Sequence, residues 1–116
     1  MPTVSASFTT AGAPYNIFDV ISGAQTTGVT LQTGSKRLIA PPRNFSRLDI
    51  TVDPNSPGGI YLTDDPTASA TNSVGKPILA GDSTLIAGNE TNRQVSLKTK
   101  YFAPTDNGTI VHFSME

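Results

Sequence analysis

Apolar and polar residues alternate over short stretches of this chain, and turn-forming residues separate the stretches. The clearest stretch is 45–52, FSRLDITV, where Leu48, Ile50 and Val52 fall on one face of an extended chain. The same criteria predict further strands at 29–32, 36–40, 60–63, 83–87, 93–101 and 109–115, and residues 77–79 could form either an edge strand or a crossing segment. Long helices are not expected, because ten Gly and nine Pro interrupt the chain throughout.

Two segments have the composition of tight turns. The segment 53–59, DPNSPGG, is dense in turn-forming residues. The dipeptide Asn107-Gly108 predicts a two-residue hairpin between the strand that ends near residue 102 and the strand at 109–115, because both residues accept a positive φ at low cost. Seven to eight short antiparallel strands, with turns about 8–12 residues apart, predict an all-β fold of the β-sandwich or jelly-roll type.

Residues 1–27 are predicted to form an extended N-terminal arm, and residues 28–116 the β-sandwich domain. The arm is rich in Gly, Ala and Thr and buries too little apolar surface to fold alone. Its one apolar cluster is too short for periodicity to distinguish a helix from a strand. Two interpretations are open: a disordered tail, or an extension that docks on a partner through the cluster residues Tyr15, Ile17, Phe18, Val20 and Ile21.

Composition argues against several classes of partner. Charged residues make up 15% of the chain and balance at a net charge of −1, and the eight basic residues are scattered. No basic surface for nucleic acid is therefore expected. No stretch approaches the roughly 20 apolar residues that span a bilayer, and the N-terminus lacks the pattern of a signal peptide. These features predict a soluble protein made in a cytoplasm. The absence of Cys excludes disulfides and thiolate catalysis.

Few residues offer binding or catalytic chemistry. His112 is the only histidine, and nucleophilic catalysis would require it to lie beside a hydroxyl and an orienting carboxylate. A lone His on a strand is more often a surface or cross-strand residue, so we expect no enzyme. A carbohydrate platform would need exposed aromatic rings, for which Tyr61 and Tyr101 are the plausible strand candidates. Core positions are the favoured interpretation of the aromatic residues.

The acidic residues give one candidate metal site. Asp64-Asp65, with Asp53 and Asn55 at the other end of the strand at 60–63, could contribute oxygens to calcium. The spacing matches no calcium-binding loop, and Asp beside Gly, Pro or Asn typically bonds its own backbone in a turn. We therefore expect these acids to be turn formers, and we expect no metal and no cofactor.

The layout of residues 45–115 resembles small β-sandwich structural proteins of tailed bacteriophages. In these proteins a strand with a Tyr and a closing Asp is followed by a polar loop, a turn that contains Gly, Pro and a Gly-acid-Ser triplet, and a second strand. The positions that match are Gly59, Ile60, Tyr61, Thr63 and Asp64, followed by Gly75, Pro77, Ile78, Leu79, Ala80, Gly81, Asp82 and Ser83.

The resemblance implies a virion protein without catalytic residues. A capsid decoration or cement protein would bind the major capsid protein on the outer surface of the head, as a dimer or trimer, and would stabilise neighbouring capsomers. In that role the N-terminal arm would contact adjacent capsomers. The alternative that the resemblance leaves open is a receptor- or carbohydrate-binding module on a tail or fibre.

Overall fold

The computed structural model describes residues 3–9, 14–36, 44–45, 47–64, 75–87, 95–96 and 100–115. Within these ranges it contains one helix, α1 (Ile17–Ser22), and eleven strands, three of them only two residues long. The strands are β1 (Thr3–Phe8), β2 (Tyr15–Asn16), β3 (Val29–Leu31), β4 (Asn44–Phe45), β5 (Arg47–Val52), β6 (Ile60–Thr63), β7 (Lys76–Ile78), β8 (Ser83–Ala87), β9 (Val95–Ser96), β10 (Tyr101–Pro104) and β11 (Thr109–Met115).

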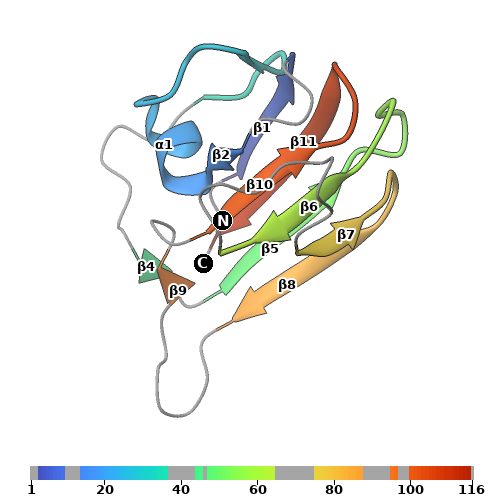
Figure 1. The fold of residues 1–116 in the computed structure, drawn as a ribbon. Coiled ribbons are helices and arrows are strands. Elements are labelled where there is room, and N and C mark those ends of the chain that lie inside the picture. Colours follow the sequence, from blue (N-terminus) through green and yellow to red (C-terminus); the bar gives the residue numbers. More distant parts are fainter. Residues whose placement is uncertain are drawn as a thin grey trace.

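The strands form antiparallel sheets, which confirms the all-β prediction (Figure 1). The first sheet has five strands in the order β3-β1-β11-β5-β8. The second has four strands in the order β2-β10-β6-β7, and β4 pairs with β9 in a separate ribbon. Consecutive strands are often in different sheets, so the chain crosses repeatedly between the two larger sheets.

The two larger sheets share one apolar core. Phe8 and Phe113 of the first sheet meet Tyr15 and Phe102 of the second. The centroid of the Phe102 ring lies 4.9 Å from the ring centroid of Phe8, 5.5 Å from that of Tyr15 and 5.4 Å from that of Phe113. All four rings are buried. The Phe8 ring meets Phe102 edge to face, the Phe113 ring is tilted against it and the Tyr15 ring is stacked on it. Aromatic pairs at such separations add to the stabilisation from burial alone, so this cluster joins the two sheets.

The stretch FSRLDITV behaves largely as its alternation predicts. Leu48, Ile50 and Val52 are buried on the inner face of β5, whereas Arg47 is exposed on the outer face. The strand begins two residues later than expected, at Arg47. The strands predicted at 29–32, 60–63 and 83–87 correspond to β3, β6 and β8, with ends that differ by at most one residue. Of the two alternatives for 77–79, the edge strand is the one observed, as β7.

The prediction of an extended arm over residues 1–27 is wrong for the residues that the structure describes. β1 pairs with β11 on one side and with β3 on the other, and it buries Val4, Ala6 and Phe8. A strand with neighbours on both sides is an interior part of its sheet. The division into an arm and a domain at residues 27 and 28 therefore does not hold, because β1, β2 and α1 contribute to the same core as the later strands.

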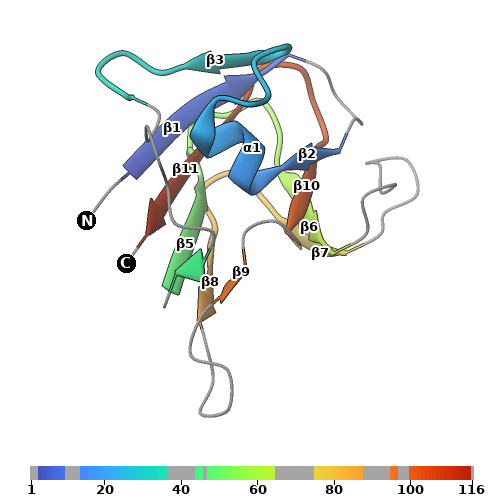
Figure 2. The ribbon, with the colours of Figure 1, turned by 90° about the vertical axis from the view of Figure 1, so that its left-hand side faces the viewer.

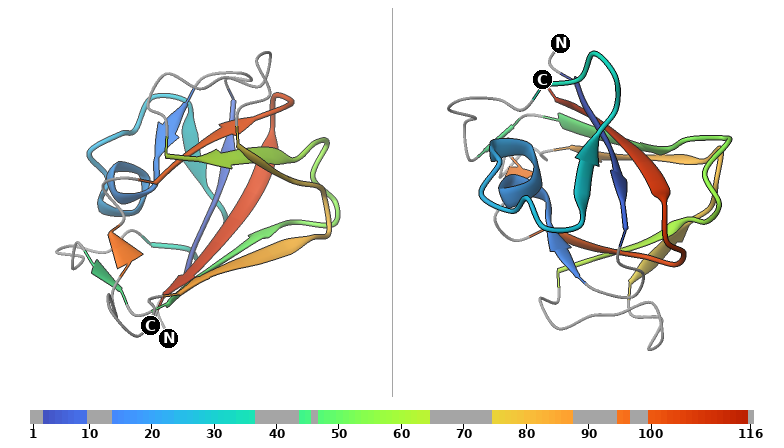
Figure 3. Two further views of the ribbon diagram at one scale, coloured as in Figure 1. Left: turned by 60° about the horizontal axis from the view of Figure 1, so that its bottom comes forward. Right: turned by 90° about the horizontal axis from the view of Figure 1, so that it is seen from above.

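The apolar cluster after β1 forms the short helix α1. Asn16 caps its N-terminus, since the Asn16 side chain accepts a hydrogen bond from the Asp19 N–H at 3.1 Å. Gly23 ends it with a φ of 89°, a left-handed conformation that favours glycine. The helix lies at the side of the molecule away from β7 and β8 (Figures 2 and 3). Three of its residues, Ile17, Val20 and Ile21, are buried.

The hairpin predicted at Asn107-Gly108 is not formed, although a turn is present there. β10 pairs with β2 and β6, whereas β11 pairs with β1 and β5, so the turn carries the chain from the second sheet to the first. Gly108 has a φ of 86°, and its N–H donates to the Phe8 carbonyl at 2.7 Å. The predicted turn is therefore present, but burial of Phe102 and Phe113 between the sheets decides which strands pair.

The strand count also differs from the seven to eight predicted. Short elements account for much of the difference, because β2, β4 and β9 are two residues each, and β1 lies in the segment assigned to the arm. The strand predicted at 93–101 corresponds to β9 and to the first residue of β10, with residues 93–94 and 97–99 outside the described part of the chain. The strand predicted at 36–40 lies outside it except for Lys36, which is not in a strand.

Candidate functional site

His112 lies between a hydroxyl and a carboxylate on the outer face of the five-stranded sheet. Its Nδ1 is 2.7 Å from Ser5 Oγ, and its Nε2 is 2.9 Å from Asp53 Oδ2. Ser5 is directly opposite His112 in the pairing of β1 with β11. Because β1 is the first strand and β11 the last, the sequence offers no local signal for this contact, and sequence analysis missed both partners.

Asp53 reaches His112 from the neighbouring strand. It follows Val52 at the end of β5, and alternation places it on the same face as Thr51, the residue paired with His112. The Asp53 N–H donates to the Ile110 carbonyl at 3.0 Å, which fixes its backbone against β11. Its second carboxylate oxygen, Oδ1, accepts the Asn55 N–H at 2.8 Å. The expectation that Asp53 is a turn former is thus confirmed, and the same carboxylate also binds the imidazole.

These contacts favour the ionised form of Asp53. The hydrogen bond from His112, followed by that from the Asn55 N–H, lowers the pKa of Asp53 below its usual value of 3.8. The carboxylate is therefore ionised at neutral pH and can only accept, so His112 Nε2 is the donor in this contact. In the tautomer with its single proton on Nε2, Nδ1 accepts the Ser5 hydroxyl proton, which gives the chain Asp53–His112–Ser5 a defined direction.

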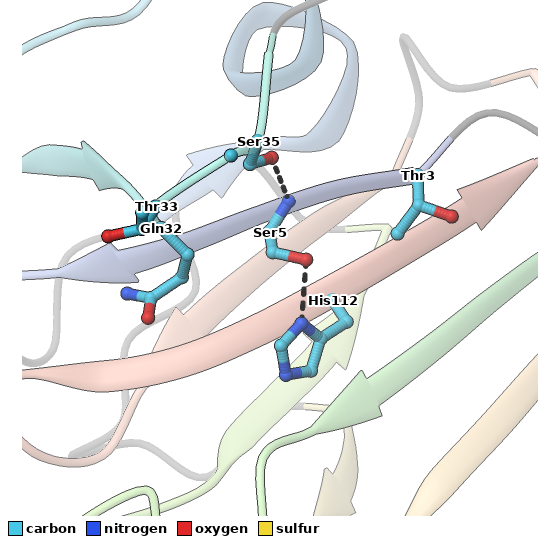
Figure 4. A pocket seen from close by; sticks show the side chains of 7 residues that line it. Thr3, Ser5, Gln32, Thr33, Ser35 and His112 are labelled. Atoms are coloured by element: carbon cyan, nitrogen blue, oxygen red, sulfur yellow. Dashed lines mark hydrogen bonds between the residues drawn. The ribbon is translucent and has the colours of Figure 1, made fainter.

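An open hollow of about 350 Å³ lies over Ser5 and His112 (Figure 4). Its lining combines hydroxyl, amide and imidazole groups from β1, β11 and the turn after β3. That turn is held against β1: the Ser5 N–H donates to Ser35 Oγ at 2.8 Å, and the Gln32 N–H donates to the Ser5 carbonyl at 2.9 Å. The residues that line the hollow are Thr3, Ser5, Gln32, Thr33, Gly34, Ser35 and His112.

The arrangement has a structural role whatever else it does. Polar pairs across neighbouring strands add modestly to the stability of a sheet, and His112 makes such contacts toward both β1 and the end of β5. His112 and Asp53 are about a third and a quarter exposed, respectively, so solvent weakens their attraction. The contacts therefore help to hold β1, β11 and the end of β5 in register, with a modest gain in the stability of the fold. They also place an oriented imidazole beside a hydroxyl.

Acid should weaken this contact through Asp53. Its pKa in the folded protein lies below the unfolded value near 3.8, so the stabilisation is complete above that pH and is lost as the pH falls through the folded value. We expect the midpoint of urea unfolding to fall less between pH 6 and pH 3 in Asp53→Asn than in the wild type. Asp49→Asn, at an acid on the same face of β5, is the matched control. Equal losses in the wild type and in Asp53→Asn would contradict this expectation.

The residues predicted to bind a partner contribute to the core instead. The side chains of Tyr15, Ile17, Val20 and Ile21 are 2% exposed or less, and that of Phe18 packs partly buried against them. Side chains that this chain already covers are not available to a second surface without local unfolding. This finding argues against the docking role expected for the segment, and the apolar cluster is explained by its own fold.

The other predicted sites receive limited support. Asp64 Oδ1 bonds to the Lys100 ammonium at 2.8 Å, and Asp65 lies outside the described residues. No group of three or more potential metal-ligating His, Cys, Asp or Glu residues occurs in the part of the chain that the structure describes. Tyr61 and Tyr101 are half-buried on adjacent strands, where Tyr61 pairs with Ala103 and Tyr101 with Thr63. The register places both rings on the same face of the second sheet.

A second surface feature is the corner formed by β7, β8 and the turn between them. Among the described residues, Leu79 and Leu85 are the large apolar side chains that are exposed, at 65% and 49%. Leu79 begins the turn, and Leu85 is on the outer face of β8. β7 and β8 are each the last strand of their sheet, so this corner brings two sheet edges together (Figures 1 and 3). We call it the β7–β8 corner.

Comparison with protein-family models, with curated proteins and with solved structures finds no significant match for this chain. Within the described residues, no helix has the length and apolar character needed to cross a membrane.

Proposed function

We propose that this protein is a structural component of a tailed-bacteriophage virion, a β-sandwich that decorates the capsid surface and stabilises neighbouring capsomers. The observation that carries the proposal is the position of the phage-like motif. Its second half, from Gly75 to Ser83, forms β7, the following turn and the start of β8, where Leu79 and Leu85 are exposed. The motif therefore contains Leu79, the more exposed of the two leucines, and Leu85 follows two residues after its end.

The β7–β8 corner is preorganised for contact. The Gly81 N–H donates to the Val52 carbonyl at 2.9 Å, and the Val52 N–H donates to the Asp82 carbonyl at 3.0 Å. The turn is closed by the Asp82 N–H, which donates to the Leu79 carbonyl at 2.9 Å. The backbone of such a fixed turn loses little further conformational freedom when Leu79 is buried by a partner, which favours tight binding.

An extended segment of the major capsid protein is the partner that fits this corner best. Among the described strands β8 has a sheet neighbour on one side only, β5, and we propose that an added strand pairs with the backbone groups on its other side. Leu85 would then pack beside the added strand while Leu79 anchors its end. Attachment through the corner replaces attachment through the N-terminal segment, whose apolar residues are in the core.

Substitution at the corner should remove capsid binding and leave the fold intact. We expect Leu79→Lys combined with Leu85→Lys to reduce binding to virus particles that lack this protein by at least tenfold, because burial of two leucines is replaced by burial of two charges. Binding is measured by co-sedimentation with the particles, and folding by circular dichroism. Phe18→Ala is the comparison variant, because Phe18 is the most exposed of the five cluster residues that the sequence predicts to dock on a partner. Unchanged binding in the double variant would contradict the proposal.

A receptor- or carbohydrate-binding module on a tail or fibre is the second candidate. It is favoured by Tyr61 and Tyr101 on one face of the second sheet, since sugars stack on aromatic rings that share a face. Immunogold electron microscopy of the particles distinguishes the two candidates. Labels over the head support decoration of the capsid, whereas labels confined to the tail support the binding module.

A further inference from the structure

We propose that Ser5 is an activated nucleophile, with His112 as its general base and Asp53 as the residue that orients the base. The substrate class is small activated acyl esters, which the hollow over Ser5 would accept. The sequence contains no local catalytic motif around His112, which argues against an enzyme. The fold, however, brings a hydroxyl and a carboxylate from distant parts of the chain into contact with this imidazole. This inference is independent of the proposed virion role.

The distances are those of a nucleophile–base–acid chain. Ser5 Oγ lies 2.7 Å from Nδ1 and Asp53 Oδ2 lies 2.9 Å from Nε2, both within hydrogen-bond reach. In the familiar serine hydrolase arrangement the carboxylate contacts Nδ1 and the serine Nε2. Here the two nitrogens exchange roles, which leaves the chemistry unchanged, because an acceptor nitrogen still faces the hydroxyl.

The three residues are held by the body of the sheet. Ser5 and His112 occupy paired positions on the neighbouring interior strands β1 and β11, and the Asp53 backbone is hydrogen-bonded to β11. Residues on regular elements hold a catalytic geometry more firmly than residues on loops. Ser7, two positions along the same face of β1, contacts the Thr30 carbonyl at 3.5 Å and provides a hydroxyl on the same strand for comparison.

The hollow limits which ester can react. At about 350 Å³ it suits a small molecule, and its lining of hydroxyl and amide groups provides no apolar pocket for a long acyl chain. Figure 4 shows the Gln32 side chain on the same side of the sheet as Ser5 Oγ and the imidazole. Amide side chains can donate to the oxyanion that forms during acyl transfer. Acetyl esters with a good leaving group are therefore the expected substrates.

The reaction would proceed in two balanced steps. Ser5 Oγ attacks the ester carbonyl carbon while its proton passes to His112 Nδ1; the bond to the leaving oxygen breaks, and that oxygen takes the proton. An acyl-serine remains. Water then attacks the acyl carbon and gives a proton to Nδ1, the bond to Ser5 Oγ breaks, and Ser5 recovers the proton. The products are one carboxylic acid and one alcohol, and no other reactant is consumed.

The proposal is tested with two probes on the full chain. We expect a fluorophosphonate to form an adduct that mass spectrometry of peptides places on Ser5, and 4-nitrophenyl acetate to release a stoichiometric burst of nitrophenol. Ser5→Ala should abolish both signals. His112→Gln should slow phosphonylation about 10²-fold or more, in line with the usual contribution of a general base. Ser7→Ala should leave both signals at the wild-type level.

Asp53 requires a separate readout, because its loss also affects stability. Phosphonylation of Asp53→Asn is measured at a temperature where circular dichroism shows that this variant is folded. Its rate should be at least tenfold below that of the wild type, and Asp53→Glu should restore part of the rate. His112→Gly supplies a second test of the base, since added imidazole should partly recover the rate. The proposal is overturned if Ser5 remains unlabelled, if label spreads equally to Ser7, or if ester hydrolysis survives Ser5→Ala.

Discussion

A protein that lacks residues 1–9 should fail to fold. The deletion removes β1 from between β3 and β11 and takes Val4, Ala6 and Phe8 out of the core. Burial of each larger apolar side chain is worth about 1.5–3 kcal/mol, and small domains have only about 5–15 kcal/mol in total. The deletion also exposes new strand edges on β3 and β11. We expect loss of cooperative unfolding and of dispersed proton NMR signals.

A complementation experiment provides the control for this deletion. A synthetic peptide of residues 1–9 supplies β1 in trans, and its addition should restore dispersed NMR signals if the deletion acts through the missing strand. A frayed tail would behave differently, because its removal would leave the urea midpoint unchanged. An unchanged urea midpoint would contradict the assignment of β1 to the core and would support an extended N-terminal arm.

Phe102→Ala should give the largest loss of stability of any single substitution in the core. Phe102 is fully buried and its ring contacts those of Phe8, Tyr15 and Phe113, so it links the two sheets. Truncation of a buried Phe typically costs about 3–5 kcal/mol, through lost transfer energy and the cavity left behind. Urea unfolding followed by circular dichroism measures the change in the free energy of unfolding.

Leu79→Ala is the matched control for Phe102→Ala. Leu79 is the most exposed of the large apolar side chains described, so its truncation should change the free energy of unfolding by no more than about 0.5 kcal/mol. Comparable losses in the two variants would show that the aromatic cluster does not dominate the core. The control also shows whether corner variants act on binding without affecting the fold.

Sequence reasoning recovered the strands with strong alternation and missed those built from small residues. β5 shows large apolar residues at every second position, which identifies it and its inner face. β1, TVSASF, has the same period, with Val4, Ala6 and Phe8 inward, but its small residues resemble those of a polar tail. For α1, the missed signals were the Asn16 cap and the Gly23 stop on either side of the apolar cluster.

The candidate site could not be derived from the sequence. The requirement that His112 meet a hydroxyl and a carboxylate follows from chemistry, but the abundance of Ser and Thr leaves the partner undetermined. Ser5 is identified only by the pairing of β1 with β11, a contact between strands from opposite ends of the described chain. Likewise, the Asn107-Gly108 turn was detectable locally, whereas the choice of partner strands depends on the core.

The pairing of β1 with β11 also constrains how the protein folds during synthesis. Thr3 and Ser114 are hydrogen-bonded partners 111 positions apart, so the central ladder of the five-stranded sheet cannot form on the ribosome until almost all of the described chain has emerged. Contacts of such high sequence separation slow folding, because a long loop must close before they form. Until β11 is synthesised, β1 lacks this partner strand and its apolar face is uncovered. We therefore expect chaperones that bind short apolar segments to bind the nascent chain at β1.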